Sequence, residues 1–194
     1  MHGLINRTIE RFVRETRGDD LWLRIAEQAE LGFVEFEAML GYDAALTERV
    51  LERVSCELLL PREAVLEDIG TYLVSHQKTE AVRRLLRFGG VDFVEFLHSL
   101  EDLPDRARLA VADLNLPELE LDERATGQFS LTVLSHNSGF GAVLLGVLRA
   151  MADDYGALAV IERRALGDRF DALDVRLLDA GFADGRSFDL ARGA

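Results

Sequence analysis

The spacing of apolar residues along the chain changes at Asn115-Leu116-Pro117. Before this point apolar residues recur every three or four positions, which is the period of an amphipathic helix. After it, Leu119 and Leu121 alternate with acidic residues, and a period of two is typical of a half-buried strand. This order predicts an α+β fold, in which a helical N-terminal layer packs on a small antiparallel sheet of about four strands crossed by one helix.

The chain is predicted to form a single domain over residues 1–182, with a helical part at 1–112 and a strand-and-helix part at 113–182. A chain of 194 residues is long enough to bury one substantial core. Gly139 to Tyr155 returns to a helical pattern and supplies the crossing helix. The remaining residues, 183–194, form a polar C-terminal tail that is expected to fray.

Two side chains on predicted helices carry specific expectations. In the first helix, Ile9 and Phe12 lie on the apolar face, which places Glu10 on the opposite, polar face. Cys56 is the only cysteine and is expected to be a small buried apolar residue. A single cysteine also excludes an intrachain disulfide and a four-thiolate metal site.

The formal net charge of −13 restricts the partners that the chain can have. An acidic surface repels phosphate backbones and anionic lipids, so we expect neither nucleic-acid binding nor membrane insertion. No apolar run approaches the roughly 18 residues of a membrane span. The first residues lack the apolar core of a secretory signal, and we expect a cytoplasmic protein.

Short segments along the chain stand in a recognisable order and spacing. They are Met1 to Asn6, Gly41-Tyr42-Asp43, Phe93 to Asp105, Leu116-Pro117 and Leu131 to Phe140. Each is weak by itself. Together they resemble the heme–nitric oxide/oxygen binding (H-NOX) family, from residue 1 to roughly residue 180.

The resemblance implies a b-type heme between the helical and sheet layers, and sensing of nitric oxide or oxygen. It also implies signalling to a cyclase, a histidine kinase or a cyclic-dinucleotide enzyme, with no catalysis by the domain itself. The proximal histidine that ligates the heme iron in the family corresponds here to Pro104. The Tyr-x-Ser-x-Arg motif that bonds the heme propionates corresponds to Val133, Ser135 and Asn137. The other pocket positions that the resemblance implies are Pro117, Ile5 and Leu144.

These residues change what such a pocket can bind. Pro104 has no donor for iron, which needs an imidazole, thiolate, thioether or phenolate. Asn137 has only neutral donors where an arginine would pair with a carboxylate, and Val133 has no hydroxyl. Three hypotheses remain: a heme sensor with an atypical ligand, a heme-free signalling module with another hydrophobic ligand, and a structural adaptor that regulates a partner enzyme through its surface with no pocket ligand.

Pro104 also constrains the backbone around it. Inside a helix, proline removes one hydrogen bond and costs about 3 kcal/mol, whereas it fits the first turn of a helix without such a loss. The sequence therefore predicts that one helix ends at Asp102 or Leu103 and that the next begins at Pro104.

The histidines are the alternative iron ligands. At about 100° per residue, His98 lies about 240° around the helix from Pro104, and His136 alternates to the other face of its strand, so neither is favoured. His76 fits the end of a helix, and His2 fits a solvated terminal position. Scattered carboxylates and a glycine-containing turn without a lysine indicate no catalytic or phosphate site.

Overall fold

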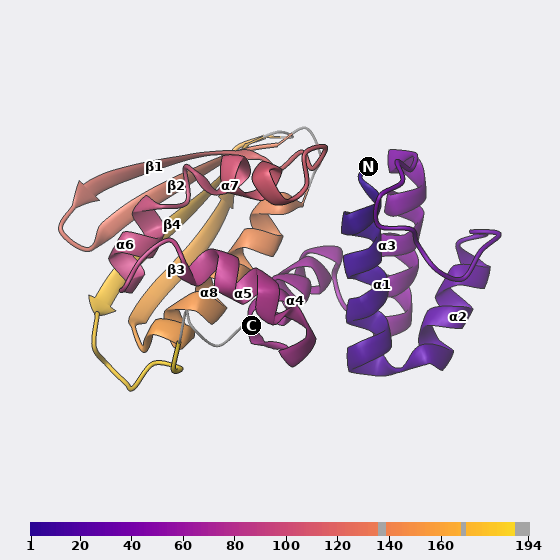
Figure 1. The fold of residues 1–194 in the computed structure, drawn as a ribbon, viewed down its shortest axis with the longest axis horizontal. Helices are drawn as coiled ribbons and strands as arrows, with labels where there is room; N and C mark the ends of the chain where they lie inside the picture. Colours follow the sequence, from indigo (N-terminus) through magenta and orange to yellow (C-terminus); the bar gives the residue numbers. More distant parts are fainter. Residues whose placement is uncertain (136–138, 168–169, 189–194) are drawn as a thin grey trace. The chain divides into compact units, whose positions relative to one another are not determined.

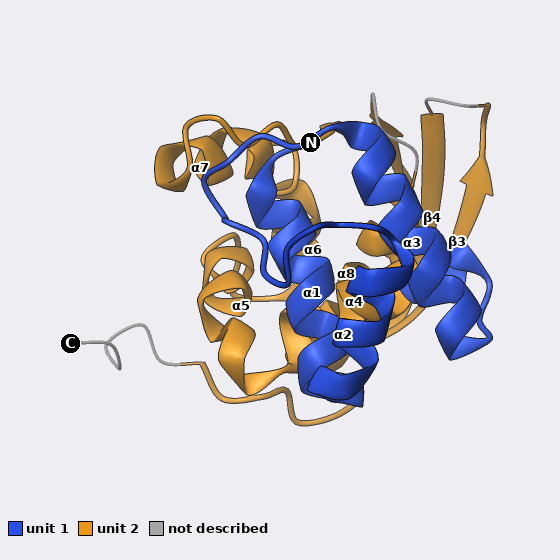
Figure 2. Cartoon of the chain, turned by 90° about the vertical axis from the view of Figure 1, so that its right-hand side faces the viewer, with its two compact units in different colours: residues 1–65 blue, residues 66–194 orange. Residues whose placement is uncertain are grey.

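The structure is a computed structural model that describes residues 1–135, 139–167 and 170–188. The chain divides into two compact units, residues 1–65 and 66–194 (Figure 2). The first unit is helical, and the second contains the sheet together with further helices (Figure 1). Each unit has buried apolar side chains of its own.

Three helices form the first unit, and a fourth begins in it. They are α1 (Gly3–Arg17), α2 (Asp19–Gln28), α3 (Ala44–Leu58) and α4 (Arg62–Ser75). Gly18, at φ 97°, ends α1 and starts α2 directly, a conformation that favours glycine. The Asp43 side chain accepts a hydrogen bond from the Ala45 amide at 2.9 Å and caps α3. His2 caps α1 in the same way, since its Nδ1 accepts from the Leu4 amide at 3.1 Å.

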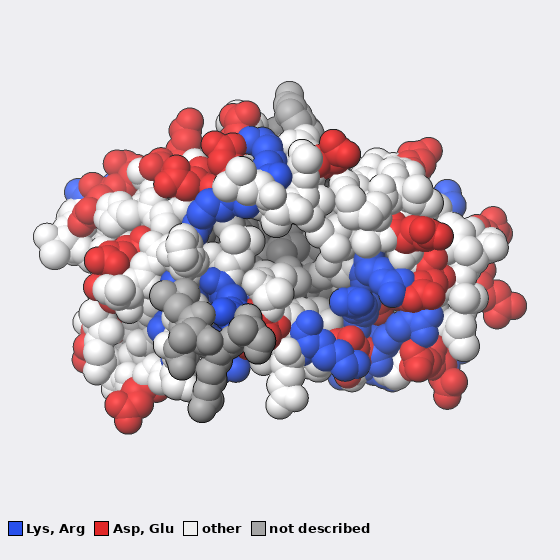
Figure 3. All heavy atoms as spheres, viewed as in Figure 1, with Lys and Arg blue, Asp and Glu red and all other residues white. Residues whose placement is uncertain are grey.

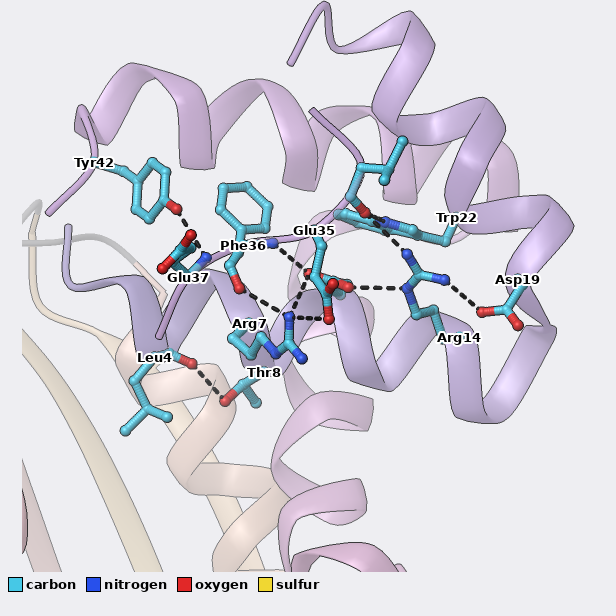
Figure 4. Close-up of polar contacts among 12 residues, drawn as sticks. Leu4, Arg7, Thr8, Arg14, Asp19, Trp22, Glu35, Phe36, Glu37 and Tyr42 are labelled. Atoms are coloured by element: carbon cyan, nitrogen blue, oxygen red, sulfur yellow. Dashed lines mark hydrogen bonds and ion pairs between the residues drawn. The ribbon is translucent and has the colours of Figure 1, made fainter. Parts of the chain in front are cut away.

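Glu10 is buried in the first unit, and the prediction of a polar-face position was wrong. Its Oε1 accepts from Nε of Arg14 at 2.9 Å, and its Oε2 accepts from the Phe36 amide at 2.8 Å (Figure 4). The same loop is held by Arg7, whose Nη1 donates to the Phe36 carbonyl at 2.9 Å. A cation and a backbone donor compensate the buried carboxylate. The helical period missed this because the covering segment is the loop between α2 and α3.

Cys56 is exposed on α3, and the prediction that it is buried was wrong. The buried stripe of α3 contains Thr47, Val50, Leu51 and Val54. Cys56 lies on the other side of this stripe, so the helix packs with the thiol facing solvent.

The second unit holds the other helices and the sheet. Its helices are the end of α4, η1 (Gln77–Thr79), α5 (Glu80–Arg87), α6 (Phe93–His98), α7 (Leu103–Ala110) and α8 (Phe140–Tyr155). Helices α4 and α8 cross closely, because a Cβ on Gly146 would lie 2.0 Å from the Glu67 carbonyl oxygen. Among the helices that the structure describes, none is long and apolar enough to cross a membrane.

The sheet has four antiparallel strands in the order β1-β2-β4-β3 (Figure 1). The strands are β1 (Glu118–Ala125), β2 (Gln128–Leu134), β3 (Leu158–Ala165) and β4 (Phe170–Asp179). Leu131 pairs with Leu173, and Ile161 pairs with Val175, so these buried residues share one face. Apolar side chains of α6 and α8 complete this core. The α+β prediction, with its sheet and crossing helix, is confirmed.

Strand β1 forms one edge of the sheet and is acidic. Figure 3 shows acidic side chains gathered over this strand, where Glu118, Glu120 and Asp122 are exposed. The Leu121 amide at the edge donates to Oε1 of Glu101 at 3.0 Å. Charge and a side-chain partner both disfavour pairing of this edge with a strand of another chain.

Candidate functional site

Pro104 is buried and is the second residue of α7, in its first turn. Helix α6 ends at His98, and the turn between the two helices closes with the Leu103 amide donating to the Leu100 carbonyl at 3.0 Å. The first turn of a helix leaves amides without intrahelical partners, so the missing N–H of proline costs little there. The predicted break before Pro104 is confirmed, but its bounds differ: α6 ends at His98, not at Asp102 or Leu103, and α7 begins at Leu103, one residue earlier than expected.

Arg106 ties this break to the helix before it. Its Nη2 donates to the Ser99 carbonyl at 2.9 Å and lies 3.3 Å from the Ser99 hydroxyl, and its Nη1 donates to the Leu85 carbonyl on α5 at 3.4 Å. Ser99 belongs to the turn between α6 and α7. A side chain two positions from Pro104 therefore fixes the turn, which nothing in the sequence pattern indicated.

Two of the three residues predicted to bind the propionates, Val133 and Ser135, lie at the end of β2. Val133 is buried on the core face of the sheet, opposite Leu119 of β1. Ser135 follows the strand and is buried. Asn137 and His136 lie outside the residues that the structure describes.

A small hollow brings Ser135 together with Pro117. It is also lined by Leu134 and by Arg108 of α7, and its volume is about 40 Å³. Pockets for small organic ligands usually measure about 300–1,000 Å³. The hollow is therefore of a size for a water molecule or one polar group of a larger ligand.

The two remaining pocket predictions fall in different units. Leu144 is buried on α8 in the core of the second unit. Ile5 is partly buried on α1 in the first unit. Both are placed on helices as the sequence predicted, and their part in binding a ligand stays a prediction.

Two arginines near these positions are already paired with carboxylates. Arg108 donates from Nη1 to Oδ1 of Asp105 at 2.6 Å. Arg163, on β3, donates from Nε to Oδ1 of Asp171 at 2.8 Å, and both side chains are largely buried. Arg163 pairs in register with Leu173, so it lies on the core face of the sheet. Sequence reasoning missed Arg163, which its apolar neighbours on that face could have indicated.

Three histidines lie in the described part of the chain, and each has a local contact. Nε2 of His98 lies 3.5 Å from Oε2 of Glu123, and its ring packs edge-on against Phe129. His2 caps α1 rather than lying free in solvent. Nδ1 of His76 accepts from the Lys78 amide at 3.3 Å. Among the described residues, no group of three or more His, Cys, Asp or Glu side chains could hold a metal ion.

The residues that the resemblance assigns to a b-type heme do not fit its chemistry. Pro104 cannot donate to iron, and Val133 is an apolar core residue. The cations nearby already neutralise acidic side chains of the chain itself. To bind a propionate, Arg108 or Arg163 would have to share or leave its own carboxylate partner.

Known proteins share both the sequence pattern and the fold. Soluble guanylate cyclase gcy-35 of Caenorhabditis elegans is 28% identical over 156 residues, which are 78% of this chain and 22% of that protein. Guanylate cyclase soluble subunit beta-2 of Rattus norvegicus is 29% identical over 93 residues, 48% of this chain and 14% of that protein. The matched parts thus span less than a quarter of these relatives.

A solved structure gives the same result for the fold. A mutant H-NOX protein from K. algicida in the unliganded Fe(II) form superposes with a TM-score of 0.80 at 17% identity, covering 92% of this chain and 97% of that one. The family model described as Haem-NO-binding matches residues 2–163. Because that match takes in both the helices and most of the sheet, the chain belongs to the haem-NO-binding (HNOB, or H-NOX) family.

Proposed function

We propose that the chain is a regulatory signalling module of the haem-NO-binding family that does not hold heme iron through position 104. The place of Pro104 carries this proposal: it is a buried residue without a donor atom, in the first turn of α7. By family resemblance, this position belongs to the histidine that ligates iron. Iron in a heme needs an axial donor, and the prolyl ring has none.

The residues at the propionate positions support the same reading. Val133 contributes to the apolar core, and Asn137 carries no charge. Arg163 is held by Asp171 in a largely buried pair, and Arg108 contacts Asp105 at the surface. A chain with a net charge of −13 gains little from two further carboxylates that lack a cation.

The output of such a module would be a contact with an enzyme. The sensor domain of this family is non-catalytic in itself, and the relatives with the matched segment are guanylate cyclases. We infer that the partner is a cyclase, a histidine kinase or a cyclic-dinucleotide enzyme. The input would be a hydrophobic ligand other than heme.

A second candidate is an adaptor that regulates a partner through its surface with no pocket ligand. The small size of the hollow beside Ser135, about 40 Å³, favours it. The apolar packing of Val133 and Leu148 in the core favours it as well. In this case the fold would serve only to hold the binding surface.

Visible spectroscopy tests the proposal directly. The chain is expressed with a heme precursor, purified, and then titrated with hemin, and the Soret band is recorded at each stage. We expect no Soret band characteristic of a ligated heme, and a titration that matches that of the Pro104→Ala control. A ligated Soret band in the unmodified chain would overturn the proposal, and single substitutions of His98, His136 and His2 would then identify the ligand.

Native mass spectrometry separates the two candidates. A bound hydrophobic ligand would appear as an added mass on the folded chain that disappears after extraction with an organic solvent. The signalling module predicts this added mass. The adaptor predicts the mass of the chain alone in every preparation.

A further inference from the structure

Residues 183–188, here called the C-terminal strap, lie against the end of α8. The strap runs from the end of β4 toward α5 (Figure 1, Figure 2). The Ala183 amide donates to the Gly156 carbonyl at 3.0 Å, and the Arg186 amide donates to the Asp154 carbonyl at 2.8 Å. A Cβ on Gly156 would lie 2.0 Å from the Ala183 carbonyl oxygen. The strap thus follows a defined path where a frayed tail was expected.

Helix α5 holds the far end of the strap through two arginines. Arg83 donates from Nη2 to the Ser187 carbonyl at 3.2 Å and from Nε to Oδ1 of Asp154 at 2.8 Å. Burial has the largest single effect and lowers the pKa of Arg83, but the hydrogen bonds and charges of Asp154 and Glu80 together raise it above its ordinary value. The guanidinium is therefore charged, and the strap is fastened to it through the Ser187 carbonyl.

Arg87 links the strap to Tyr155. Its guanidinium carbon lies 3.9 Å from the centre of the Tyr155 ring and 5.1 Å from the centre of the Phe188 ring. A guanidinium within about 6 Å of an aromatic ring is attracted by the ring face. Arg87 therefore contacts the last described residue of the strap and the last residue of α8 at once.

Tyr155 in turn contacts the start of α6. Its hydroxyl donates to the Gly90 carbonyl at 2.8 Å. A Cβ on Gly90 would lie 2.5 Å from the Phe96 amide nitrogen, and one on Gly89 would lie 2.0 Å from Oγ of Ser99. Ser99 is the residue held by Arg106 of α7.

The contacts are continuous from the strap to α7, and they are mediated by packed rings, backbone and a buried ion pair. If α7 moved, the bonds from Arg106 would carry the movement to Ser99, whose hydroxyl occupies the space beside Gly89. A shift of the turn before α6 would weaken the bond between the Gly90 carbonyl and the Tyr155 hydroxyl, and the Tyr155 ring lies against Arg87.

We propose that the C-terminal strap is a latch whose closure is coupled to the position of α6 and α7 through Arg87 and Tyr155. In the closed state Ser187 and Phe188 contact Arg83 and Arg87, and in the open state these contacts are lost while Arg83 stays bound to Asp154. The proposal does not depend on which ligand, if any, the module binds. The latch can therefore be tested independently of the heme titration, which tests the proposed function.

Hydrogen–deuterium exchange of the full chain tests the coupling, with Tyr155→Phe as the first variant. This substitution keeps the ring beneath Arg87 and removes only the hydroxyl, which points at Gly90 and not at the strap. Loss of one hydrogen bond should speed exchange at the Gly89–Val91 turn by about fivefold. The latch predicts that the strap amides of Ala183 and Arg186 also exchange faster, by about threefold.

Phe188→Leu tests the same coupling from the other end. It should speed exchange of the strap and also of the turn at Gly89–Val91, which is linked to Phe188 through Arg87 and Tyr155. Phe182→Leu is the matched control, since this ring is 61% exposed and precedes the strap. Exchange at the amides of β2 and β4 reports global unfolding. If one of the two variants also speeds exchange there, the coupling is judged from the other variant. Faster exchange confined to the substituted end, in whichever variant stays folded, would overturn the latch.

Discussion

Arg83 and Asp154 form an ion pair between Nε and Oδ1 at 2.8 Å, with 5% and 1% of their side chains exposed. The two residues are 71 positions apart, on α5 and α8. Burial removes both groups from water, so each needs charged partners for compensation. Arg83 also pairs with Glu80 at 2.9 Å, and Asp154 also lies 3.7 Å from Arg87. This pair fixes α5 to the end of α8.

Asp154→Asn should therefore lower the free energy of unfolding by about 1.5–3 kcal/mol, because it removes the buried charged partner of Arg83 and leaves only Glu80, whose side chain is 45% exposed. Urea denaturation followed by circular dichroism measures the change. The control is Asp105→Asn, which breaks a pair with 45% and 81% of its side chains exposed, and such a pair contributes less than about 1 kcal/mol. Equal losses in the two variants would contradict the prediction.

Gly146→Ala should destabilise the second unit although alanine favours a helix more than glycine does. The new Cβ would lie 2.0 Å from the Glu67 carbonyl oxygen and 2.9 Å from the Thr71 amide nitrogen, both backbone atoms. Overpacking of this kind costs about 1–3 kcal/mol, against a gain of about 1 kcal/mol in helix propensity. Thermal unfolding should show a lower Tm than in Gly181→Ala, where a Cβ meets nothing within 4 Å. A Tm of Gly146→Ala at or above that of Gly181→Ala would contradict the prediction, because it would show that α4 and α8 separate easily.

The sequence was sufficient for the sheet and for the break before α7. Alternation of Leu119, Leu131 and Val133 predicts which strand face is buried, and these residues are buried together. Pro104 predicts the helix boundary because proline restricts the backbone wherever it stands. Both signals are local, so they can be read without knowing what packs against them.

The features that the sequence did not reveal depend on contacts between distant segments. Glu10 is buried because a loop 26 positions later donates its Phe36 amide. The strap is held because Arg83 reaches Ser187, 104 positions away. Polar residues such as these have no periodic pattern, so their burial becomes visible only when their partners are placed.

A gain of heme binding would show whether the pocket survives in this chain. The double variant Pro104→His/Asn137→Arg supplies an imidazole and a cation at the two positions, and the backbone of residue 104, in the first turn of α7, does not require proline. If the module retains its cavity, hemin titration of this variant should produce a ligated Soret band that the control Pro104→Ala/Asn137→Arg lacks. A folded double variant without the band would favour the adaptor over the ligand-binding module.

Tyr155 should make stability fall at alkaline pH. Burial raises the pKa of its hydroxyl from 10.0 to about 12, with Arg87 opposing the shift and Asp154 adding to it. Because the folded state holds the proton more tightly, the stabilisation is complete below pH 10 and is lost as the pH rises towards 12. The ionised phenolate can no longer donate to the Gly90 carbonyl.

The free energy of unfolding, measured with urea across this range, should fall in the unmodified chain and fall less in Tyr155→Phe, so that the two curves converge. Parallel curves would mean that the hydroxyl titrates alike in the folded and unfolded chain, and the bond between Tyr155 and Gly90 would then contribute nothing to the closed latch.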